Sequence, residues 1–254
     1  MPKFFVKTEQ LNDNKITIVG EDVKHIKNVL RLKVDDNIQI CNLETSINYT
    51  CGISKINSDN IECIIFNETS SNCESNVQIS IFQGLPKADK MELIIQKSVE
   101  LGAYEITPIK MKRCVVKFDE KTKNKKIERW QKISEVAAKQ SGRDIVPKVN
   151  NIINIKNVCN LIQNYDIVLL AYENEQTNTL KDELLKIKNK SNGKINIGII
   201  IGPEGGIDKE EVELLKNSGA KVITLGKRIL RTETVALAMT SVIMYELEDL
   251  GGNI

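Results

Sequence analysis

Residues 195–238 read INIGIIIGPEGGIDKEEVELLKNSGAKVITLGKRILRTETVALA and contain two strand-to-loop-to-helix units. The apolar run 195–201 and the shorter run 222–225 predict strands, and a loop and a helical pattern follow each of them. Successive units of this kind predict parallel strands, with loops 202–206 and 226–234 at the carboxyl edge of one sheet. Because ligands bind at that edge in open α/β sheets, we expect the function to lie in these two loops.

The same alternation of strands and helices covers the chain from residue 77 to residue 250. Strands are expected at 77–82, 105–109 and 167–171, and helices at 89–101, 124–141 and 180–187. Asp89 and Asp208 are each expected to cap the following helix, as part of a capping box with Glu92 and Glu211. The pattern therefore predicts an α/β domain with a mostly parallel sheet over residues 73–254.

The first part of the chain, up to about residue 66, has an all-β pattern. Short runs rich in Ile, Val, Phe and Tyr predict strands at 3–7, 16–19, 37–43, 47–56 and 60–66. Only residues 22–31 have helical spacing. Several closely spaced short strands predict a small β-barrel over residues 1–72. The polar stretch 67–76 is interpreted as a linker, with the domain boundary near residue 72.

Composition limits the classes of function. The 254 residues include no run of 18 apolar residues, and the apolar run at the N-terminus is too short for a signal peptide. We therefore expect a cytoplasmic protein without a membrane segment. The six cysteines form no CxxC pair and His25 is the only histidine, so neither a metal site nor a Ser-His-Asp triad is expected.

The charge is unevenly distributed. The net charge is +2, but residues 110–148 carry thirteen Lys and Arg against five Asp and Glu, which gives +8 there and −6 elsewhere. Such a block fits a polyanionic partner. It also fits a solvated helix face, which is the interpretation that charge alone favours.

The first loop, Gly202-Pro203-Glu204-Gly205-Gly206, is a glycine turn after a strand. Glycine permits positive φ angles and lets a ligand approach the main chain. The loop matches neither the phosphate-binding GK[ST] loop nor the dinucleotide fingerprint GxGxxG. Because Asp208 is expected to occupy part of the next helix N-terminus, the pattern argues mildly against a nucleoside triphosphate.

The second loop places bulky apolar residues where a solvated loop would have polar ones. Ile229 and Leu230 are expected either to line a pocket or to pack beneath the chain. Thr232 or Thr234 would cap the last helix, and Glu233 suits the positive end of its dipole. Arg231 opposes that dipole, which makes it a candidate functional residue.

The residues of these two loops, together with other stretches along the chain, resemble a known family, the SPOUT (trefoil-knotted) methyltransferases that methylate N3 of a uridine in small-subunit ribosomal RNA. The resemblance rests on stretches that follow in order along nearly the whole chain: VLRL at 29–32, QKSVELG at 96–102, RCVVK at 113–117, RWQKI at 129–133, QSGR at 140–143, IGPEGG at 201–206 and LGKRILRTET at 225–234. One departure is the pair Asp35-Asp36, where the family tends to have Gly-Asp.

The resemblance implies an N-terminal PUA-like β-barrel and a C-terminal knotted domain that binds S-adenosylmethionine. It also implies a homodimer in which the partner completes each site. The alternation of strands and helices alone would predict an unknotted, doubly wound sheet, since knots are nearly absent from folds at large.

The resemblance also suggests site residues. The expected cofactor contacts are Leu170, Ala171, Gly202, Pro203, Glu204, Gly205, Leu225, Gly226, Ile229, Leu230, Arg231 and Thr234. Glu233 and Glu204 are both candidates for the base that takes the uridine N3 proton, while Arg231 would orient the base or a phosphate or stabilise charge on the uracil oxygens.

The resemblance also implies that the basic block, residues 110–148, contributes to an RNA-binding surface. The expected RNA contacts are His25, Arg31, Arg113, Lys117, Arg129, Lys132 and Arg143. For His25 a plain surface or cap position is an equal alternative. Trp130 has helical spacing with Ile127 and Ile133, so we expect it in the core and not as a stacking platform for bases.

The sequence therefore predicts S-adenosylmethionine-dependent methylation of uridine N3 in 16S ribosomal RNA, with the RNA or the small ribosomal subunit as partner. One alternative is a ribose 2′-O-methyltransferase of the same superfamily. Another is a non-catalytic RNA-binding assembly factor, against which the intact motifs in both loops argue. An NAD(P) enzyme would need the dinucleotide fingerprint, which this chain lacks.

Overall fold

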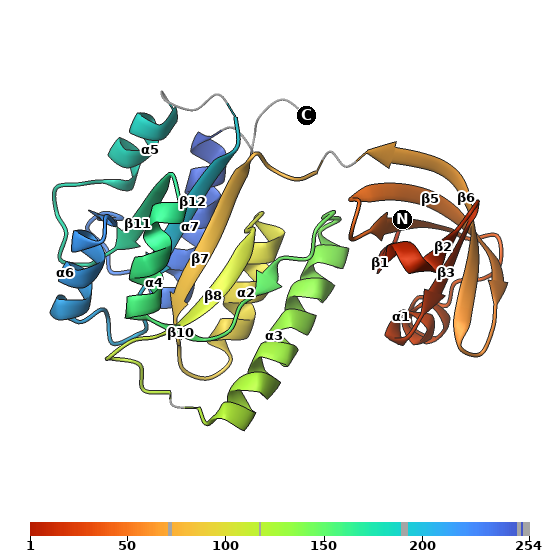
Figure 1. The fold of residues 1–254 in the computed structure, drawn as a ribbon, viewed down its shortest axis with the longest axis horizontal. Helices are drawn as coiled ribbons and strands as arrows, with labels where there is room; N and C mark the ends of the chain where they lie inside the picture. The colour runs from red at the N-terminus through yellow and green to blue at the C-terminus, as the bar shows by residue number, and fades with distance from the viewer. Residues whose placement is uncertain (71–72, 117, 189–192, 248–249, 251–254) are drawn as a thin grey trace. The chain divides into compact units, whose positions relative to one another are not determined.

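The computed structural model shows a chain of two units (Figure 1). The residues that the structure describes are 1–70, 73–116, 118–188, 193–247 and 250. The first unit comprises Met1–Glu74 with Ala138–Val146, and the second comprises Ser75–Ala137 with Pro147–Ile254. The boundary expected at residue 72 falls outside the described residues, and the first unit includes a segment, 138–146, that the sequence pattern assigned to the second domain.

The first unit is built on a six-stranded mixed sheet with the strand order β1-β4-β5-β6-β3-β2. Its strands are β1 (Lys3–Val6), β2 (Leu11–Asn12), β3 (Lys15–Val19), β4 (Asn37–Asn42), β5 (Ile47–Ile56) and β6 (Asn60–Ser70). β1 and β4 are parallel, and the other neighbours are antiparallel. Because β6 continues to Ser70, residues 67–70 belong to a strand and the linker interpretation was wrong for them.

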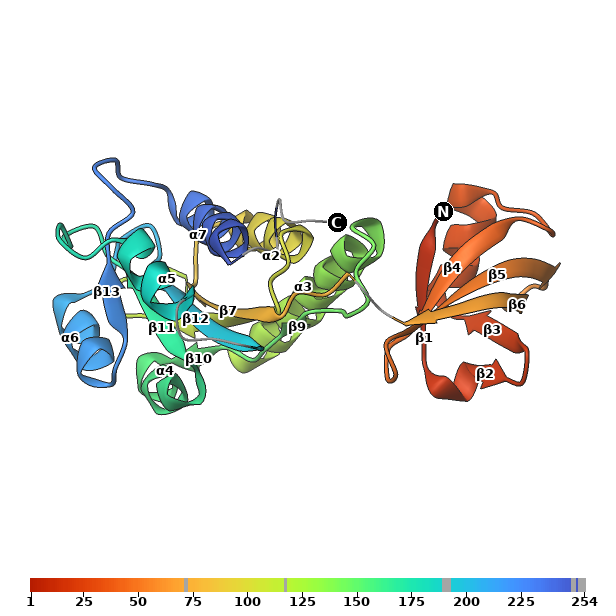
Figure 2. The same ribbon diagram turned by 90° about the horizontal axis from the view of Figure 1, so that it is seen from above.

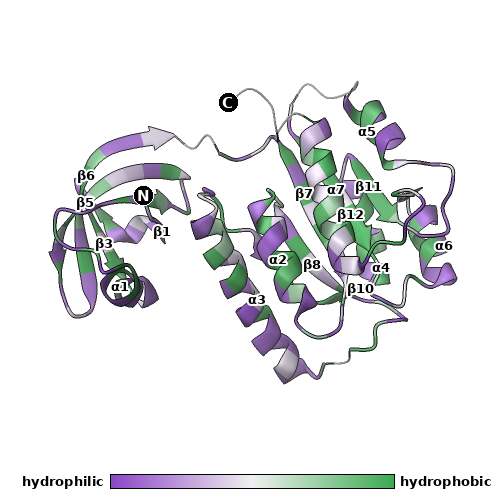
Figure 3. Ribbon diagram, turned by 180° about the vertical axis from the view of Figure 1, so that it is seen from behind, coloured by the Kyte–Doolittle hydropathy of each residue, from purple (hydrophilic) through white to green (hydrophobic). Residues whose placement is uncertain are grey.

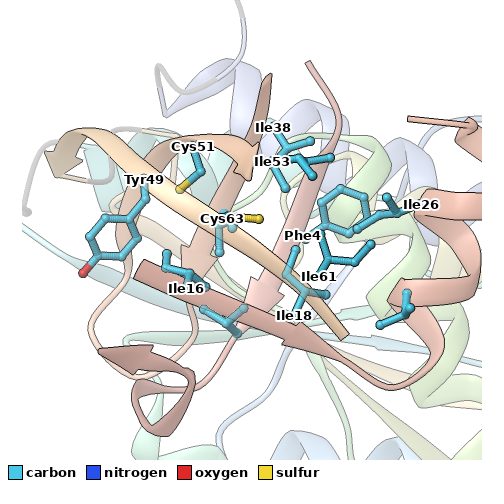
Figure 4. Close-up of a cluster of buried hydrophobic side chains, with 13 residues drawn as sticks. Phe4, Ile16, Ile18, Ile26, Ile38, Tyr49, Cys51, Ile53, Ile61 and Cys63 are labelled. Carbon is cyan, nitrogen blue, oxygen red and sulfur yellow. The ribbon is translucent and has the colours of Figure 1, made fainter. Parts of the chain in front are cut away.

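The sheet surrounds an aliphatic core that alternate strand residues supply (Figure 4). Residues Ile16, Ile18, Ile38 and Ile61 have at most 1% of their surface exposed. The expected helix is present as α1 (Glu21–Lys24), which continues as a π-helical turn, η2 (His25–Leu30). A short 3-10 turn, η1 (Thr8–Gln10), precedes β2.

The departure from the family pattern falls on an unusual backbone conformation. Asp35 has φ 75°, in the left-handed region that glycine occupies without penalty. Asp tolerates this region better than most residues, because its short polar side chain can bond locally. Asp35 therefore adopts the conformation of the turn, but at a higher conformational energy than glycine would have there.

Segment 138–146 is fastened into the first unit by buried polar contacts. Asp144 is 2% exposed, forms an ion pair with Lys3 and accepts a hydrogen bond of 2.7 Å from Asn48 Nδ2. Arg143 is 7% exposed and pairs with Glu74 at 2.6 Å. Buried charges need such partners, so these residues hold the segment in place.

The second unit contains a seven-stranded sheet with the order β10-β8-β7-β12-β11-β13, and β9 pairs with β8. Its strands are β7 (Val77–Gly84), β8 (Glu105–Lys110), β9 (Lys148–Val149), β10 (Ile153–Asn154), β11 (Ile167–Ala171), β12 (Ile195–Ile201) and β13 (Lys221–Ile223). Every pairing is parallel. The parallel sheet is confirmed, although the sequence pattern missed β9 and β10.

Helices cover both faces of this sheet. They are α2 (Lys90–Glu100), α3 (Glu120–Gln140), α4 (Ile155–Leu161), α5 (Leu180–Lys188), α6 (Lys209–Asn217) and α7 (Thr232–Glu246), with a 3-10 turn, η3 (Ile162–Asn164), after α4. α2 and α7 pack together on one face, while α4 and α6 pack on the other (Figure 2). The strands are strongly hydrophobic (Figure 3), as expected for a sheet that is buried on both faces.

Only one of the two aspartate caps that the sequence predicted at helix starts is present. Asp208 caps α6 by accepting from the N–H of Glu210 at 3.2 Å, as expected, but Glu211 accepts from the N–H of Lys112 and forms no capping box. At α2 the N–H of Glu92 bonds the main-chain oxygen of Asp89, so the predicted side-chain cap was wrong.

Two further expectations concern the helices. Trp130 on α3 is 3% exposed, which confirms its assignment to the core. Across the described part of the chain, no helix has the length and apolarity needed to cross a membrane.

Candidate functional site

A cavity of about 490 Å³ lies where β11, β12 and β13 end, at the edge of the sheet that the sequence predicted. Its walls combine both loops with the chain that follows β11 and the first residue of α2. The lining residues are Lys90, 171–173, 201–207, 224–232 and Val235. The two loops therefore meet in one site.

The first loop, 202–206, is held in a defined turn. The N–H of Gly206 donates to Pro203 O at 2.9 Å, and Gly206 has φ 70°. A Cβ at Gly202 would lie 2.7 Å from Ile207 Cγ1, closer than packed carbons approach. Arg113 Nη1 donates to Gly205 O at 3.3 Å. This loop is therefore a fixed wall of the cavity.

The second loop, 225–231, has few internal bonds. Among the residues that the structure describes, the only main-chain N–H of this loop with a protein acceptor is that of Gly226, which donates to Thr224 Oγ1 at 3.2 Å. Ile229 lines the cavity but is 90% exposed. Of the two expectations for Ile229, a place in the pocket wall and a place beneath the chain, the structure supports the first.

Thr232 ties the second loop to the first. Its hydroxyl donates to Gly202 O at 2.7 Å and accepts from Gln83 Nε2 at 2.8 Å, while the residue is only 6% exposed. Thr232 is the first residue of α7, and the N-cap is Arg231, which makes no side-chain cap bond. The predicted threonine cap was therefore wrong, because this hydroxyl serves a long-range contact.

Three charged side chains meet beside the cavity. Lys90 Nζ lies 2.9 Å from Glu204 Oε1 and 3.4 Å from Glu233 Oε2. Burial would raise the pKa of the Glu204 carboxyl, but the hydrogen bonds from Lys90 and from the main-chain N–H of Lys87 outweigh it and hold this pKa below its ordinary value. The pKa of Lys90 is raised, chiefly by its hydrogen bond to Glu204.

Arg231 differs from this cluster. It is exposed, lines the cavity and makes no ion pair with any residue in the described ranges. Its guanidinium is therefore available to a ligand or substrate, and the role that the sequence suggested for it stays a prediction.

Most of the expected cofactor contacts line the cavity, with two exceptions. Leu170 is fully buried in the core of the second unit, because it points into the layer between sheet and helices. Thr234 is exposed on α7, outside the cavity wall. Of the catalytic candidates, Glu204 and Arg231 line the cavity, whereas Glu233 reaches it only through Lys90.

The sequence-based prediction missed several lining residues. Lys90, Tyr172 and Thr224 all follow the carboxyl ends of parallel strands, Lys90 by way of the loop after β7. Extending the strand-end rule to every strand of the sheet would have included them. The sequence pattern placed Lys90 at the start of the helix expected at 89–101 and gave it no place in the site.

The expected RNA contacts have different surroundings. His25 and Arg31 are exposed in the first unit, and Arg113, Arg129 and Lys132 are exposed in the second. Arg129 also pairs with Glu92 at 2.8 Å. Arg143 is buried against Glu74, so we leave it out of the proposed RNA surface. Lys117 lies outside the described residues.

The cavity suits S-adenosylmethionine in chemistry and size. Its volume lies in the range of about 300–1,000 Å³ that is typical of small-molecule sites. Apolar side chains from Leu225, Ile229 and Leu230 stand beside main-chain N–H groups that have no protein acceptor in the described chain. An adenine ring needs this combination of an apolar slot and main-chain hydrogen bonds.

Comparison with known proteins identifies the family. Residues 73–244 match the RNA methyltransferase domain and residues 18–66 match the RNA methyltransferase PUA domain. The ribosomal RNA small subunit methyltransferase E of Bacillus subtilis is 37% identical over the full length of both chains.

Solved structures agree with this assignment. One is a ribosomal RNA small subunit methyltransferase E from Neisseria gonorrhoeae bound to S-adenosyl methionine, with 30% identity, coverage of 96% of this chain and 97% of that chain, and a TM-score of 0.83. Another is a Legionella pneumophila methyltransferase in complex with the same cofactor, with 27% identity, 96% coverage of both chains and a TM-score of 0.84. The chain therefore belongs to the ribosomal RNA small subunit methyltransferase E family, with a PUA-like first unit and a SPOUT methyltransferase fold, the trefoil-knotted type, in the second.

Proposed function

We propose that this protein is an S-adenosylmethionine-dependent methyltransferase that modifies N3 of a uridine in 16S ribosomal RNA. The observation that carries the proposal is the single cavity that both loops form at the carboxyl edge of the parallel sheet. Membership of a family whose relatives are named ribosomal RNA small subunit methyltransferases supports the substrate class. Two relatives with the cofactor in their structures support the cofactor.

When bound, S-adenosylmethionine supplies an electrophilic methyl group, and the protein has to position the uridine against it. The fixed loop 202–206 and the apolar residues of loop 225–231 would hold the cofactor. Arg231 lines the cavity and makes no ion pair with any residue that the structure describes, so it can orient the uracil and stabilise negative charge on its oxygens. Positioning of this kind supplies much of the rate in a displacement reaction.

The proton on uridine N3 must leave as the new bond forms, so the site needs an acceptor. Glu204 and Glu233 both lie near Lys90 and are the carboxylates that the sequence suggested. A ribose 2′-O-methyltransferase would instead take its proton from a hydroxyl group, and the two reactions leave different nucleosides.

We also propose that the protein is a cytoplasmic homodimer in which the partner completes each site. The outer side of α7 supports a dimer, because Val242 and Tyr245 are 45% and 69% exposed and present apolar surface. Sedimentation analysis at micromolar concentration tests this. A monomer that retains full activity would contradict the shared site.

Nucleoside mass spectrometry of 16S ribosomal RNA from a deletion strain tests the reaction. Loss of 3-methyluridine, restored by the gene on a plasmid, is the expected result. Loss of a 2′-O-methylated nucleoside with 3-methyluridine intact would identify the alternative enzyme. An unchanged nucleoside profile together with defective subunit assembly would favour the non-catalytic assembly factor.

A further inference from the structure

We infer that Lys90 is a positioning residue that makes Glu204 the acceptor of the uridine N3 proton, with Glu233 as the reserve counter-ion of Lys90. The inference rests on the proposed function and divides the roles of two carboxylates that the sequence leaves equivalent. It follows from three features of the cluster: which carboxylate the cavity exposes, how each is bonded, and what net charge they share.

The cavity exposes only one of the two carboxylates. Glu204 lines its wall with 24% of its side chain exposed. Glu233 does not line it, and its Oε2 atom is buried without a hydrogen-bond partner among the described residues. A substrate in the cavity can therefore reach Glu204, while Glu233 lies behind Lys90.

The cluster carries one negative charge more than it can balance. Two carboxylates share a single ammonium group, so the net charge of Lys90, Glu204 and Glu233 is −1. Uptake of one proton makes the cluster neutral. In this step the N–H bond at uridine N3 would break, and its proton would bind a Glu204 oxygen. The electron pair left on nitrogen would form the bond to the methyl carbon, while the bond between that carbon and the sulfonium sulfur breaks and its electron pair stays on sulfur, which leaves as a neutral thioether.

Glu233 makes this protonation possible. In the resting site Lys90 is closer to Glu204, at 2.9 Å, than to Glu233, at 3.4 Å. Once Glu204 is neutral, Lys90 still has a full ion-pair partner in Glu233, whose Oε2 then gains the hydrogen bond that it lacks. Without Glu233, protonation of Glu204 would leave a half-buried ammonium without a counter-ion.

Other charged side chains, Glu173 and Arg231 among them, line the same cavity as Glu204. The thiol of Cys114 is near, and burial raises its pKa, so it stays protonated and does not compete for the proton. Arg113 Nη1 donates to the main-chain oxygen of the neighbouring Gly205 at 3.3 Å. Lys87 contributes its main-chain N–H, which donates to both Glu204 oxygens at 3.1 and 3.3 Å.

The test is the pH dependence of kcat for methylation of small ribosomal subunits by full-length variants. For E204Q we expect kcat to fall by about 10²–10⁴-fold with the loss of its acidic limb. For K90M the pKa of Glu204 loses its main lowering contact, so the acidic limb should move to higher pH. For E233Q Lys90 acts on Glu204 alone, so the limb should move to lower pH while the plateau of kcat falls.

Two further variants separate positioning from damage. K90R should restore the acidic limb of K90M towards its original pH. K97M removes a lysine of the same helix that pairs with Glu100 at 2.8 Å outside the cavity, and it should leave the profile unchanged. K90M and E233Q should keep the far-UV circular dichroism spectrum and a single cooperative denaturant transition, which shows that both variants fold. K90M should have a lower free energy of unfolding, because Glu204 and Glu233 lose their shared cation.

Shifts of K90M and E233Q in the same direction, or an E204Q enzyme with kcat within a few-fold of normal, would overturn the inference. These results differ from failure of the proposed function, in which the unmodified protein itself would form no 3-methyluridine. If E204Q fails to fold, the opposite shifts of K90M and E233Q still decide the question.

Discussion

The two loops of the cavity have the same position in the fold but opposite construction. Loop 202–206 is fixed from within by the Gly206–Pro203 bond and from outside by Arg113, Thr232 and Lys90. Loop 225–231 has one internal bond from its amides in the described chain and carries Ile229 with 90% of its surface exposed. The first loop is a preformed wall, whereas the second has its bonding groups free for a ligand.

The contrast implies that the first loop contributes to both stability and binding, whereas the second contributes to binding. Changes in the first loop and its contacts should affect both folding and binding. Changes in the second should affect binding alone.

Removing the contact between the loops should have the largest effect. Thr232→Val deletes a hydroxyl that donates to Gly202 O and accepts from Gln83 Nε2, which keeps its bond to Gly84 O. A buried polar group that loses its partner costs about 1–3 kcal/mol. We expect a loss of about 3 kcal/mol by denaturant unfolding. Thr234→Val, at an exposed position of the same helix, is the control and should stay within about 0.5 kcal/mol.

Crowding the first loop should cost somewhat less. Gly202→Ala places a methyl group 2.7 Å from Ile207 Cγ1, and overpacking of this kind costs about 1–3 kcal/mol. Calorimetry should also show weaker S-adenosylmethionine binding. Full stability together with normal binding in this variant would mean that the first loop is not a rigid wall.

Removing the carboxylate of the first loop should have a smaller effect that depends on pH. The folded-state pKa of Glu204 lies below its ordinary value of 4.5, so its ionised form stabilises the fold above that pH. This contribution disappears as the pH falls through the folded-state pKa. Glu204→Gln should therefore lower the thermal midpoint at pH 7, and the difference from the unmodified protein should shrink below pH 4.5. A difference that grows on acidification would contradict this.

Shortening the exposed side chain of the second loop should leave folding almost unchanged. Ile229→Ala removes atoms that are already in water, so the free energy of unfolding should change by less than about 0.5 kcal/mol. If Ile229 covers the bound cofactor, calorimetric affinity should fall by about 1 kcal/mol, or roughly fivefold. Equal affinity in both proteins would remove Ile229 from the site.

The sequence predicted the sheet edge and both loops, because strand periodicity and glycine turns are local signals. It also predicted that Glu204 and Arg231 would lie there. It did not predict Thr232 as the tie between the loops or Lys90 as the centre of the charged cluster. These roles depend on partners more than 100 positions away, such as Gln83 for Thr232 and Glu204 for Lys90. Local patterns contain no information about such contacts.

In the first unit, too, the sequence pattern did not predict contacts between residues that lie far apart in the chain. Strand patterns predicted β1, β3, β4 and β5 closely, but segment 138–146 belongs to this unit through contacts of Asp144 with Lys3 and Asn48. Its basic residues read as a solvated or RNA-binding stretch in the sequence. The structure instead uses Arg143 internally, paired with Glu74.

Hydrogen exchange with and without S-adenosylmethionine tests the central claim, that two unlike loops bind one cofactor. The amides of residues 227–230, which have no protein acceptor in the described chain, should exchange fast in the free protein and become strongly protected with the cofactor. Loop 202–206 should change little, because the protein already holds it. Unchanged exchange in the second loop at saturating cofactor, or protection confined to the first, would contradict the account.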